Sequence, residues 1–218
     1  MIHDFGITWA HRDQLVNGLI NTVWLSLAGA ALAFALGCLI AMVLMARAPG
    51  LAAAARGFVD AMRCVPFLLF AYLVYYGLPS FGIRFTNFGA GLIALTLYNA
   101  AYMAELLRAA WSALPREMLE AGHAFGFTGL SLFRRIVLPP VILAAIPMIG
   151  NQLIQIIKDS AFLTIIAVPE LTHEASSIQA TYFVPFAAFV TAVVLYWVLC
   201  MVVEAAVGAV GRLAEARR

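Results

Sequence analysis

The chain has 218 residues, of which 64% are hydrophobic and 11% are charged, and its formal net charge is +2. A soluble domain has about a quarter of its residues charged, and the mean hydropathy of +0.97 is far outside that class. The composition excludes an ordinary soluble domain and indicates an all-α, polytopic protein surrounded by membrane lipid. The small net charge gives no reason to expect a nucleic-acid partner.

In chain order, five apolar segments are long enough to cross a bilayer, which takes about 20 helical residues. We expect spans at approximately 14–46, 58–78, 88–110, 136–157 and 183–203, all within one domain over residues 1–218. The first segment is too long for a signal peptide and lacks a basic start, so we expect it to remain as an anchor. Arg47, Pro49, Gly50 and Arg56 indicate a loop after it, and Pro147 predicts a kink in the fourth span.

The basic residues are distributed unequally between the two sides of such a five-span chain. Arg12, Arg84 and Lys158 fall on one side. Ten arginines fall on the other side: Arg47, Arg56, Arg63, Arg108, Arg116, Arg134, Arg135, Arg212, Arg217 and Arg218. Because basic loops stay in the cytoplasm, we expect the N-terminus outside and the C-terminus in the cytoplasm.

The longest polar interruption is the segment 114–135, which this orientation places in the cytoplasm. Pro115 can occupy the first position of a helix that runs from Glu117 through Phe125. Gly126 follows where a left-handed C-terminal cap is needed. Thr128 is a plausible N-cap for a second short helix ending at Arg134 and Arg135. Two short helices at a membrane surface would form a protrusion for a partner to grip.

Polar residues inside or at the ends of spans are the candidate pathway residues, because charges in hydrocarbon usually face a cavity or a partner. Asp159 is a candidate for binding the ammonium group or side chain of an amino acid, and an interfacial pair with Lys158 is the alternative. Asn151 and Gln155 share a helical face, while Gln152 is offset. These amides would either line a polar track or bond neighbouring helices.

Three further charged residues, Glu105, Arg108 and Arg63, have either a structural or a pathway role. Glu105 and Arg108 are three residues apart, so they either neutralise each other or act in the pathway. Arg63, with Pro66, either shapes the second span or takes a direct part.

The remaining chemistry of the chain excludes several activities. No phosphate-binding loop of the form G-x4-G-K-[ST] is present, and the single lysine has no glycines before it. ATP would therefore have to be bound by a separate subunit, and we expect no cofactor in this chain. Cys38, Cys64 and Cys200 have no metal-ligand spacing, and we expect them to be small buried hydrophobes.

The cytoplasmic segment also resembles a known family. Glu120, Ala121, Gly122, Gly126, Ile136, Leu138 and Pro139 follow the spacing E-A-A-x3-G-x9-I-x-L-P. This is similar to the EAA loop of the permease subunits of bacterial ABC importers, with Gly122 in place of the third-position alanine. The resemblance implies a MetI-like fold whose loop is a coupling helix seated on an ATPase. Glu120 would pair with a basic residue of that partner, and Ala121 and Gly122 would allow close approach.

Other stretches narrow the resemblance to the histidine, glutamine and opine type of polar amino-acid permease. Residues 63–68, 75–79, 101–108 and 158–171 resemble its R-G-x-P-L-L, Y-Y-G-L-P, A-Y-x-A-E-x-x-R and K-D-T-S-L-x8-E-L runs. Together with the EAA loop they cover about residues 14–205. The chain departs at Cys64, at Glu117-Met118 and at Ser160–Phe162, so the identity of the substrate is not carried over from any one relative.

The resemblance implies the permease subunit of an ATP-driven importer in the bacterial inner membrane, moving a polar amino acid or an opine-like derivative into the cytoplasm. It implies three partners: an ABC ATPase that binds ATP and Mg²⁺, a second permease chain, identical or paralogous, and a periplasmic or extracellular solute-binding protein. The alternative is a gradient-driven secondary transporter, which usually contains internal repeats; none is apparent. No nucleophile–base set or metal cluster indicates an enzyme.

Overall fold

Four long helices lie side by side along the molecule: α2 (Arg12–Met45), α5 (Asn87–Ser112), α8 (Leu138–Ser160) and α10 (Pro185–Glu215). The computed structural model describes residues 2–46 and 48–215. The predicted cytoplasmic arginines Arg47, Arg217 and Arg218 lie outside this part. Within it, four helical segments can cross a membrane, and a bent pair of helices makes a fifth if it is counted as one span. The all-α membrane fold is confirmed.

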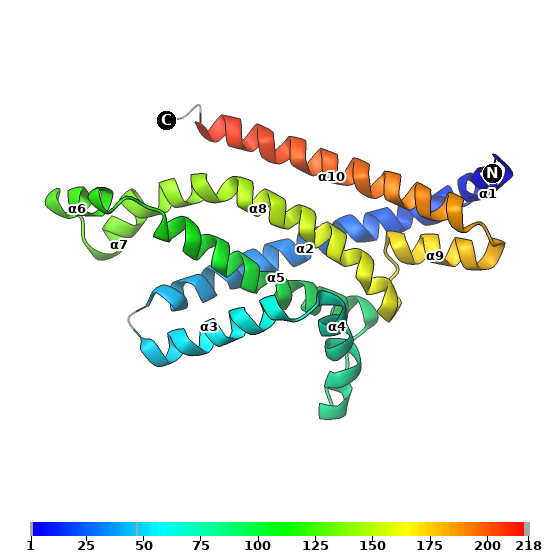
Figure 1. Ribbon diagram of the computed structural model, residues 1–218, viewed down its shortest axis with the longest axis horizontal. Coiled ribbons are helices and arrows are strands. Elements are labelled where there is room, and N and C mark those ends of the chain that lie inside the picture. The colour runs from blue at the N-terminus through cyan, green and yellow to red at the C-terminus, as the bar shows by residue number, and fades with distance from the viewer. Residues whose placement is uncertain (1, 47, 216–218) are drawn as a thin grey trace.

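Shorter elements lie at the ends and on one flank (Figure 1). The α6 helix (Arg116–Ala124), α7 (Gly129–Leu132) and the π-helical η3 (Phe133–Val137) form one end, where the last helix also terminates. The opposite end holds α1 (Ile2–Ala10) and α9 (Leu171–Tyr182). The 3₁₀ segment η4 (Ala161–Ile166) connects α8 to this end and packs against α4. On the flank, α3 (Pro49–Cys64) is followed by α4 (Phe67–Tyr72), η1 (Leu73–Gly77) and η2 (Leu78–Phe81).

The second predicted span, over about 58–78, is not one continuous helix. The α3 helix already begins at Pro49, so the loop expected through Arg56 is wrong beyond residue 48. The chain then bends by 109° between α3 and the segment Phe67–Phe81. Pro66 causes the bend, because the residue before a proline is excluded from helical geometry; Val65 is extended, with φ −92° and ψ 134°.

The second short helix also differs from its prediction. It does not end at Arg134 and Arg135 but continues through η3 into α8. Pro139 and Pro140 do not break this junction, because prolines are tolerated in the first turn of an α-helix and α8 begins at Leu138. Pro147 lies inside α8, which curves along its length (Figure 1).

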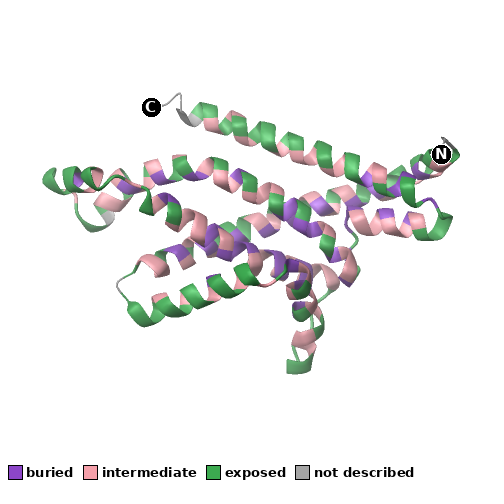
Figure 2. Cartoon of the chain, viewed as in Figure 1, coloured by how far each residue is buried: buried purple, intermediate pink, exposed green. Residues whose placement is uncertain are grey.

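Buried residues concentrate where α2, α5 and α8 meet, and the outer faces of the long helices are exposed (Figure 2). Leu25, Leu95, Met103 and Ile156 are among the core residues that are almost completely buried. Large apolar residues such as Trp24 and Trp197 are exposed on the outer faces. An exposed apolar surface of this kind suits contact with lipid tails.

Small residues allow α2 and α5 to approach closely. A Cβ added to Gly37 would lie 2.6 Å from the Cβ of Met103 and 3.1 Å from the backbone oxygen of Ala100. Neither atom belongs to the flexible end of a side chain, so a larger residue would push the two helices apart.

We therefore expect Gly37→Leu to lower the thermal stability of the purified chain. Overpacking of this kind costs about 1–3 kcal/mol or more. The measurement is the unfolding temperature in detergent. Gly208→Leu is the matched control, because no atom lies within 4 Å of a Cβ at Gly208. Equal unfolding temperatures for the two variants would contradict the prediction.

Candidate functional site

The segment 114–135, which carries the EAA-like motif, forms the tip of one end of the molecule. The α6 helix ends in a Schellman cap, in which the amide of Gly126 donates to the oxygen of His123 at 2.9 Å and the amide of Phe127 donates to Gly122 at 3.0 Å. Gly126 has φ +81°, as this cap requires. The predicted left-handed position at Gly126 is confirmed.

The motif residues divide between an inner and an outer side of α6. Gly122 is buried against Leu132, and a Cβ at Gly122 would lie 2.6 Å from the end of that side chain. Glu120 and Ala121 are exposed. Gly122 thus lets α6 lie on the following helical segment while its neighbours face outward.

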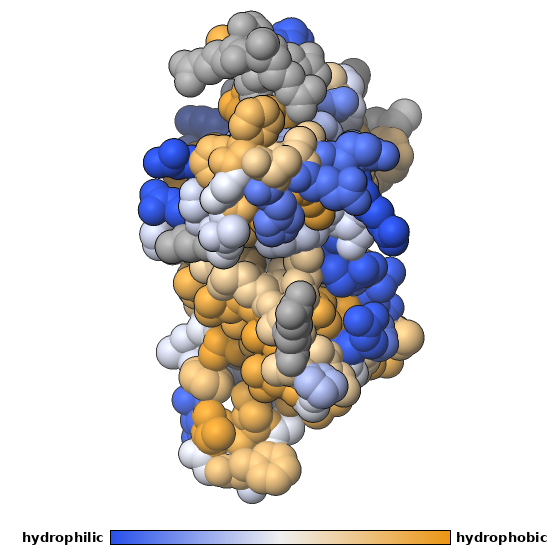
Figure 3. All heavy atoms as spheres, turned by 90° about the vertical axis from the view of Figure 1, so that its left-hand side faces the viewer, coloured by the Kyte–Doolittle hydropathy of each residue, from blue (hydrophilic) through white to orange (hydrophobic). Residues whose placement is uncertain are grey.

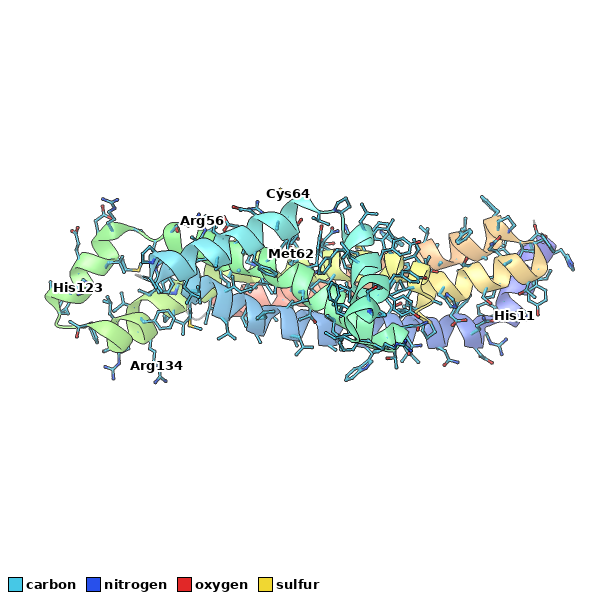
Figure 4. The ribbon with its side chains drawn as sticks, turned by 90° about the horizontal axis from the view of Figure 1, so that it is seen from below. His11, Arg56, Met62, Cys64, His123 and Arg134 are labelled. Carbon is cyan, nitrogen blue, oxygen red and sulfur yellow. The ribbon has the colours of Figure 1, made fainter. Side chains whose placement is uncertain are left out.

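An exposed aromatic residue accompanies them. Phe125 is 80% exposed at the end of α6, and His123 projects at the same tip (Figure 4). Hydrophilic residues flank this end in the view of Figure 3, whereas the protruding α4–η2 limb below is mostly hydrophobic. Aromatic residues are enriched at protein-contact surfaces. The motif spacing did not single out Phe125.

A polar cavity of about 270 Å³ lies between α5 and α8. It is lined by Tyr98, Tyr102, Gln152, Gln155 and Asp159. Asp159 is only 3% exposed. Its Oδ1 accepts a hydrogen bond of 2.8 Å from Gln155, and the Asn99 side chain also interacts with this carboxyl. Its Oδ2 is buried and accepts no hydrogen bond of normal geometry from the described chain. The cavity therefore contains an acceptor that a cationic group could satisfy.

Aromatic residues on α5 form the opposite wall. The Tyr98 hydroxyl donates to the carbonyl oxygen of Val65 at 3.1 Å and lies 3.4 Å from the Tyr102 hydroxyl. Val65 is the extended residue at the bend after α3. This hydrogen bond connects the bend after α3 to the wall of the cavity. It satisfies the Val65 carbonyl, which has lost its helical partner because α3 ends there.

Only some of the amides predicted to line a polar track along α8 lie in the cavity. Gln152 lines the cavity together with Gln155, although helical periodicity places it off the face that Asn151 and Gln155 share. The Nε2 of Gln152 donates a hydrogen bond of 2.7 Å to the Oδ1 of Asn99. Asn151 is exposed and does not line this cavity. Asn99 is fully buried and was missed because an isolated asparagine in an apolar run carries no spacing signal.

The remaining charged residues that the sequence suggested for the pathway lie outside the polar cavity or lack the predicted partner. Glu105 and Arg108 form a two-point ion pair, in which the Nε–Oε2 distance is 2.8 Å and the Nη2–Oε1 distance is 2.6 Å. No ion pair joins Asp159 to Lys158 in the part of the chain that the structure describes. Arg63 is exposed in the last turn of α3, next to the bend at Pro66, which fits the prediction that it lies where the second span is shaped. Cys64 beside it is also exposed, so the expectation that this cysteine is buried is wrong.

A buried carboxyl lies at the opposite end of the bundle. Glu170 is 0% exposed and caps α9, accepting hydrogen bonds from the amides of Thr172 and His173 at 2.8 and 2.7 Å. The Tyr196 hydroxyl on α10 donates to its Oε2 at 2.6 Å. The next residue, Leu171, donates its amide to Thr22 on α2 at 3.1 Å. These bonds connect α9 to two long helices.

Burial raises the pKa of Glu170 to about 7, and the hydrogen bonds from Tyr196, Thr172 and His173 offset only part of the effect. The folded protein then binds a proton more tightly than the unfolded chain, where the pKa is near 4.5. The stabilisation from protonation is complete below about pH 4.5 and is lost as the pH rises through about 7.

We expect the unfolding temperature of the wild-type chain to fall, relative to that of Glu170→Gln, between pH 5 and pH 8. The corresponding difference in unfolding free energy is about 3 kcal/mol at most. Scans in detergent at several pH values measure it. Gln is uncharged at every pH, so parallel curves for the two proteins would contradict the prediction.

An all-helical membrane bundle with an exposed helical tip and a polar internal cavity has the architecture of a membrane transport subunit. Comparison with known proteins defines the class further. Residues 33–215 match the family described as binding-protein-dependent transport system inner membrane component, and the chain belongs to this family. It is a permease subunit of an ABC importer, a multi-pass inner membrane protein and not an enzyme.

Individual relatives agree with this assignment. The chain is 35% identical over 216 residues to the octopine transport system permease protein OccQ of Rhizobium radiobacter, covering 94% of this chain and 90% of that protein. It is 30% identical over 193 residues to the probable glutamine ABC transporter permease protein GlnM of Bacillus subtilis, covering 88% and 89%. The predicted family is confirmed, and the gradient-driven alternative is not supported.

Solved structures show the same fold. An amino acid ABC transporter crystallised with histidines matches with a TM-score of 0.88 and 27% identity, over 93% of this chain and 95% of that one. The inward-facing MetNI methionine ABC transporter matches in fold with a TM-score of 0.80 at 20% identity, over 94% and 98%. Membership of the family implies an ATPase partner and a solute-binding protein.

Proposed function

We propose that this permease moves a polar amino acid or an amino-acid derivative, such as an opine, into the cytoplasm. The observation that carries the substrate class is the buried Asp159 in the polar cavity. Its unpartnered Oδ2 is an acceptor for an ammonium group, and a charged hydrogen bond of this kind is among the stronger ones in proteins. The names of the relatives, which include glutamine and octopine transport proteins, support the same class.

The remaining cavity groups suit a small polar solute. The amides of Gln152 and Gln155 and the hydroxyls of Tyr98 and Tyr102 provide both donors and acceptors. The volume of about 270 Å³ is at the lower limit of pockets that hold drug-sized ligands, about 300 Å³. An amino acid is smaller than such ligands. Arg63, beside the bend, would act on the solute outside this cavity, and Glu105 would keep Arg108 in place.

The exposed tip of α6 is the proposed contact with the ATPase, which would bind ATP and Mg²⁺. Glu120 would pair with a basic group of that subunit, Ala121 and Phe125 would enter its surface, and Gly126 would hold the turn. Because Gly122 fixes α6 against the segment leading into α8, a displacement of the tip would be passed to the helix that carries Asp159.

We also propose that a second permease chain completes the transport path and that the N-terminus faces outward. In Figure 1 the end of α10 and the α6–α7 tip lie at one end of the molecule, and α1 lies at the other. With the basic residues Arg116, Arg134 and Arg135 at the α6–α7 end, the positive-inside rule puts that end in the cytoplasm.

Reconstitution tests the proposal. The chain, its ATPase and its solute-binding protein are placed in proteoliposomes containing ATP, and uptake of radiolabelled glutamine, histidine, arginine and octopine is measured. We expect ATP-dependent uptake of at least one of them and a rise in ATPase activity with the loaded binding protein. Uptake that persists without the ATPase, or that occurs only with a sugar or an inorganic ion, would overturn it.

A further inference from the structure

A second pocket, of about 220 Å³, lies between α2, α5 and the segment that leads into α8. Its walls are apolar side chains, among them Cys38 and Met42 of α2, Trp111 of α5 and Val141 of α8. Unlike the cavity that contains Asp159, it has no charged or amide side chain in its lining. A smaller apolar cavity, of about 150 Å³, stays dry and holds a benzene-sized molecule. This pocket therefore suits a hydrocarbon ligand and not a polar solute.

The π-helical turn η3 shapes one wall of the pocket. Phe133 and Leu138 are five residues apart, and both line it. In a regular α-helix, with 3.6 residues per turn, two such residues would point to different sides. A π turn bonds residues five apart and brings them onto one side, and such turns are frequent at functional sites. The Phe133 ring also stacks on Trp111, with ring centroids 5.2 Å apart and an angle of 22° between the planes.

The pocket is accessible from the surface that lipid covers. Met42 lines it and is exposed, and Leu39, three residues earlier on α2, is exposed as well. Both residues belong to the first membrane-spanning helix. Methionine side chains are flexible and adapt to irregular apolar partners. A lipid chain beside α2 can therefore enter the pocket from the membrane.

A cation lies at the end of the pocket that is nearer the α6 tip. Arg134 follows Phe133 directly and precedes Leu138 by about one helical turn, on the same side. It is exposed, projects from this end in Figure 4, and forms no ion pair in the part of the chain that the structure describes. The neighbouring Arg135 lies over the Phe127 ring, 5.9 Å from its centroid. A ligand with an apolar chain and an anionic group would match both parts.

We propose that an anionic phospholipid binds here, with one acyl chain in the apolar pocket and its phosphate at Arg134. The hydrocarbon walls belong to membrane-spanning helices, and the arginine lies beyond them toward the membrane surface. Basic pockets between membrane helices on the cytoplasmic side are typical sites for anionic lipid headgroups. The inference rests on the proposed function only for the orientation, which assigns the lipid to the cytoplasmic leaflet.

Fluorescence quenching of Trp111 tests the site. Trp9, Trp24 and Trp197 are exposed, so their replacement by Phe leaves Trp111 as the only tryptophan of a folded, full-length chain. This chain is reconstituted alone in phosphatidylcholine vesicles that contain a graded fraction of dibrominated phosphatidylglycerol or dibrominated phosphatidylcholine. We expect half-quenching at a fraction of the anionic lipid about fivefold lower, the effect of one arginine beside an anionic headgroup.

Two other results of this measurement would overturn the proposal. Equal quenching of Trp111 by the two brominated lipids would show only unselective contact with bulk lipid. No quenching by either lipid would show that protein covers the pocket. A chain with Trp24 as its only tryptophan is the control, because Trp24 is exposed on α2 and does not line the pocket. We expect the two lipids to quench it equally.

Neutralisation of one arginine tests the headgroup contact. In the chain that keeps only Trp111, Arg134→Gln should abolish the preference for phosphatidylglycerol. Arg212→Gln is the matched control, because Arg212 is exposed in the last turn of α10 and α10 contributes no residue to the pocket. This variant should keep the preference. A preference that survives Arg134→Gln would contradict the assignment of the phosphate to Arg134.

Cysteine labelling tests the position of the acyl chain. Cys38 lines the pocket, Cys200 of α10 does not, and both are partly buried. Single-cysteine versions of the full chain are treated with N-ethylmaleimide, which is small and crosses membranes. We expect phosphatidylglycerol in the vesicles to slow the reaction of Cys38 at least about threefold relative to pure phosphatidylcholine, and to leave Cys200 unchanged. An unchanged rate at Cys38 would contradict an acyl chain in the pocket.

The quenching and labelling measurements do not depend on transport, so they separate this inference from the proposed function. Normal ATP-dependent uptake by the complete complex, together with no lipid preference at Trp111, would reject only the lipid site. Absent uptake, together with a clear preference for phosphatidylglycerol at Trp111, would reject only the proposed function.

Discussion

Transport is expected to fall by at least tenfold in Gly126→Asp, while the chain still folds and assembles in the membrane. Gly126 has φ +81° at the end of α6, and no atom lies within 4 Å of a Cβ at this position. A side chain therefore meets no obstacle inside the chain, and the left-handed geometry costs only about 1–2 kcal/mol. The new carboxylate instead projects from the tip that we assign to the ATPase contact. The measurements are uptake and ATP hydrolysis by the reconstituted complex.

Gly82→Asp is the matched control for this prediction. Gly82 has φ +80° and equally open surroundings, so the two variants carry the same backbone strain. It follows η2 on the protruding limb, away from the α6 tip (Figure 1). We expect Gly82→Asp to keep most of the uptake. Normal uptake by Gly126→Asp would contradict the assignment of α6 as the coupling element. An equal loss of uptake in both variants would show that backbone strain, and not the ATPase contact, causes the effect.

Asp159→Asn is expected to reduce uptake by about tenfold to a hundredfold without lowering the unfolding temperature. A hydrogen bond to a charged group is worth about 1.5–3 kcal/mol, and each 1.4 kcal/mol is a factor of ten. Stability should be unchanged or higher, because the wild-type chain buries a carboxylate oxygen without a partner, which is unfavourable in itself. Uptake in proteoliposomes and unfolding in detergent measure the two effects.

Asn151→Ala provides the comparison on the same helix. Asn151 is exposed and lies outside the polar cavity, so its removal should change uptake less than about twofold. Normal uptake by Asp159→Asn, or a marked loss of uptake in Asn151→Ala alone, would contradict the proposal that the substrate passes through the cavity. A large fall in the unfolding temperature of Asp159→Asn would instead indicate a structural carboxyl.

Elements that depend on local chemistry could be predicted from the sequence. The apolar segments follow from hydropathy, because an apolar segment of about 20 residues in hydrocarbon satisfies its own backbone groups by forming a helix. The cap at Gly126 follows from the conformational freedom of glycine, and the α6 boundaries (Arg116–Ala124) are close to the predicted 117–125. The ion pair of Glu105 with Arg108 follows from a spacing of three residues within one helix.

Features that depend on how helices face one another required the tertiary structure. Periodicity groups Asn151 with Gln155, but it does not say which side of α8 packs against α5; that packing decides that Gln152 lines the cavity. Asn99 is positioned by Gln152, 53 residues further along the chain, so no local pattern reveals it. The capping bonds of Glu170 are local, but its bond to Tyr196, 26 residues away, depends on how α10 packs.

Composition alone identifies a helical membrane protein, and the EAA-like spacing around Gly126 carries the resemblance to the permease subunits of ABC importers. The place where the helix after Pro49 bends, the polar groups that meet in the cavity and the outward exposure of the α3 charges became known from the packing of the helices. The burial of a side chain depends on which neighbours cover it, and those neighbours come from distant parts of the chain.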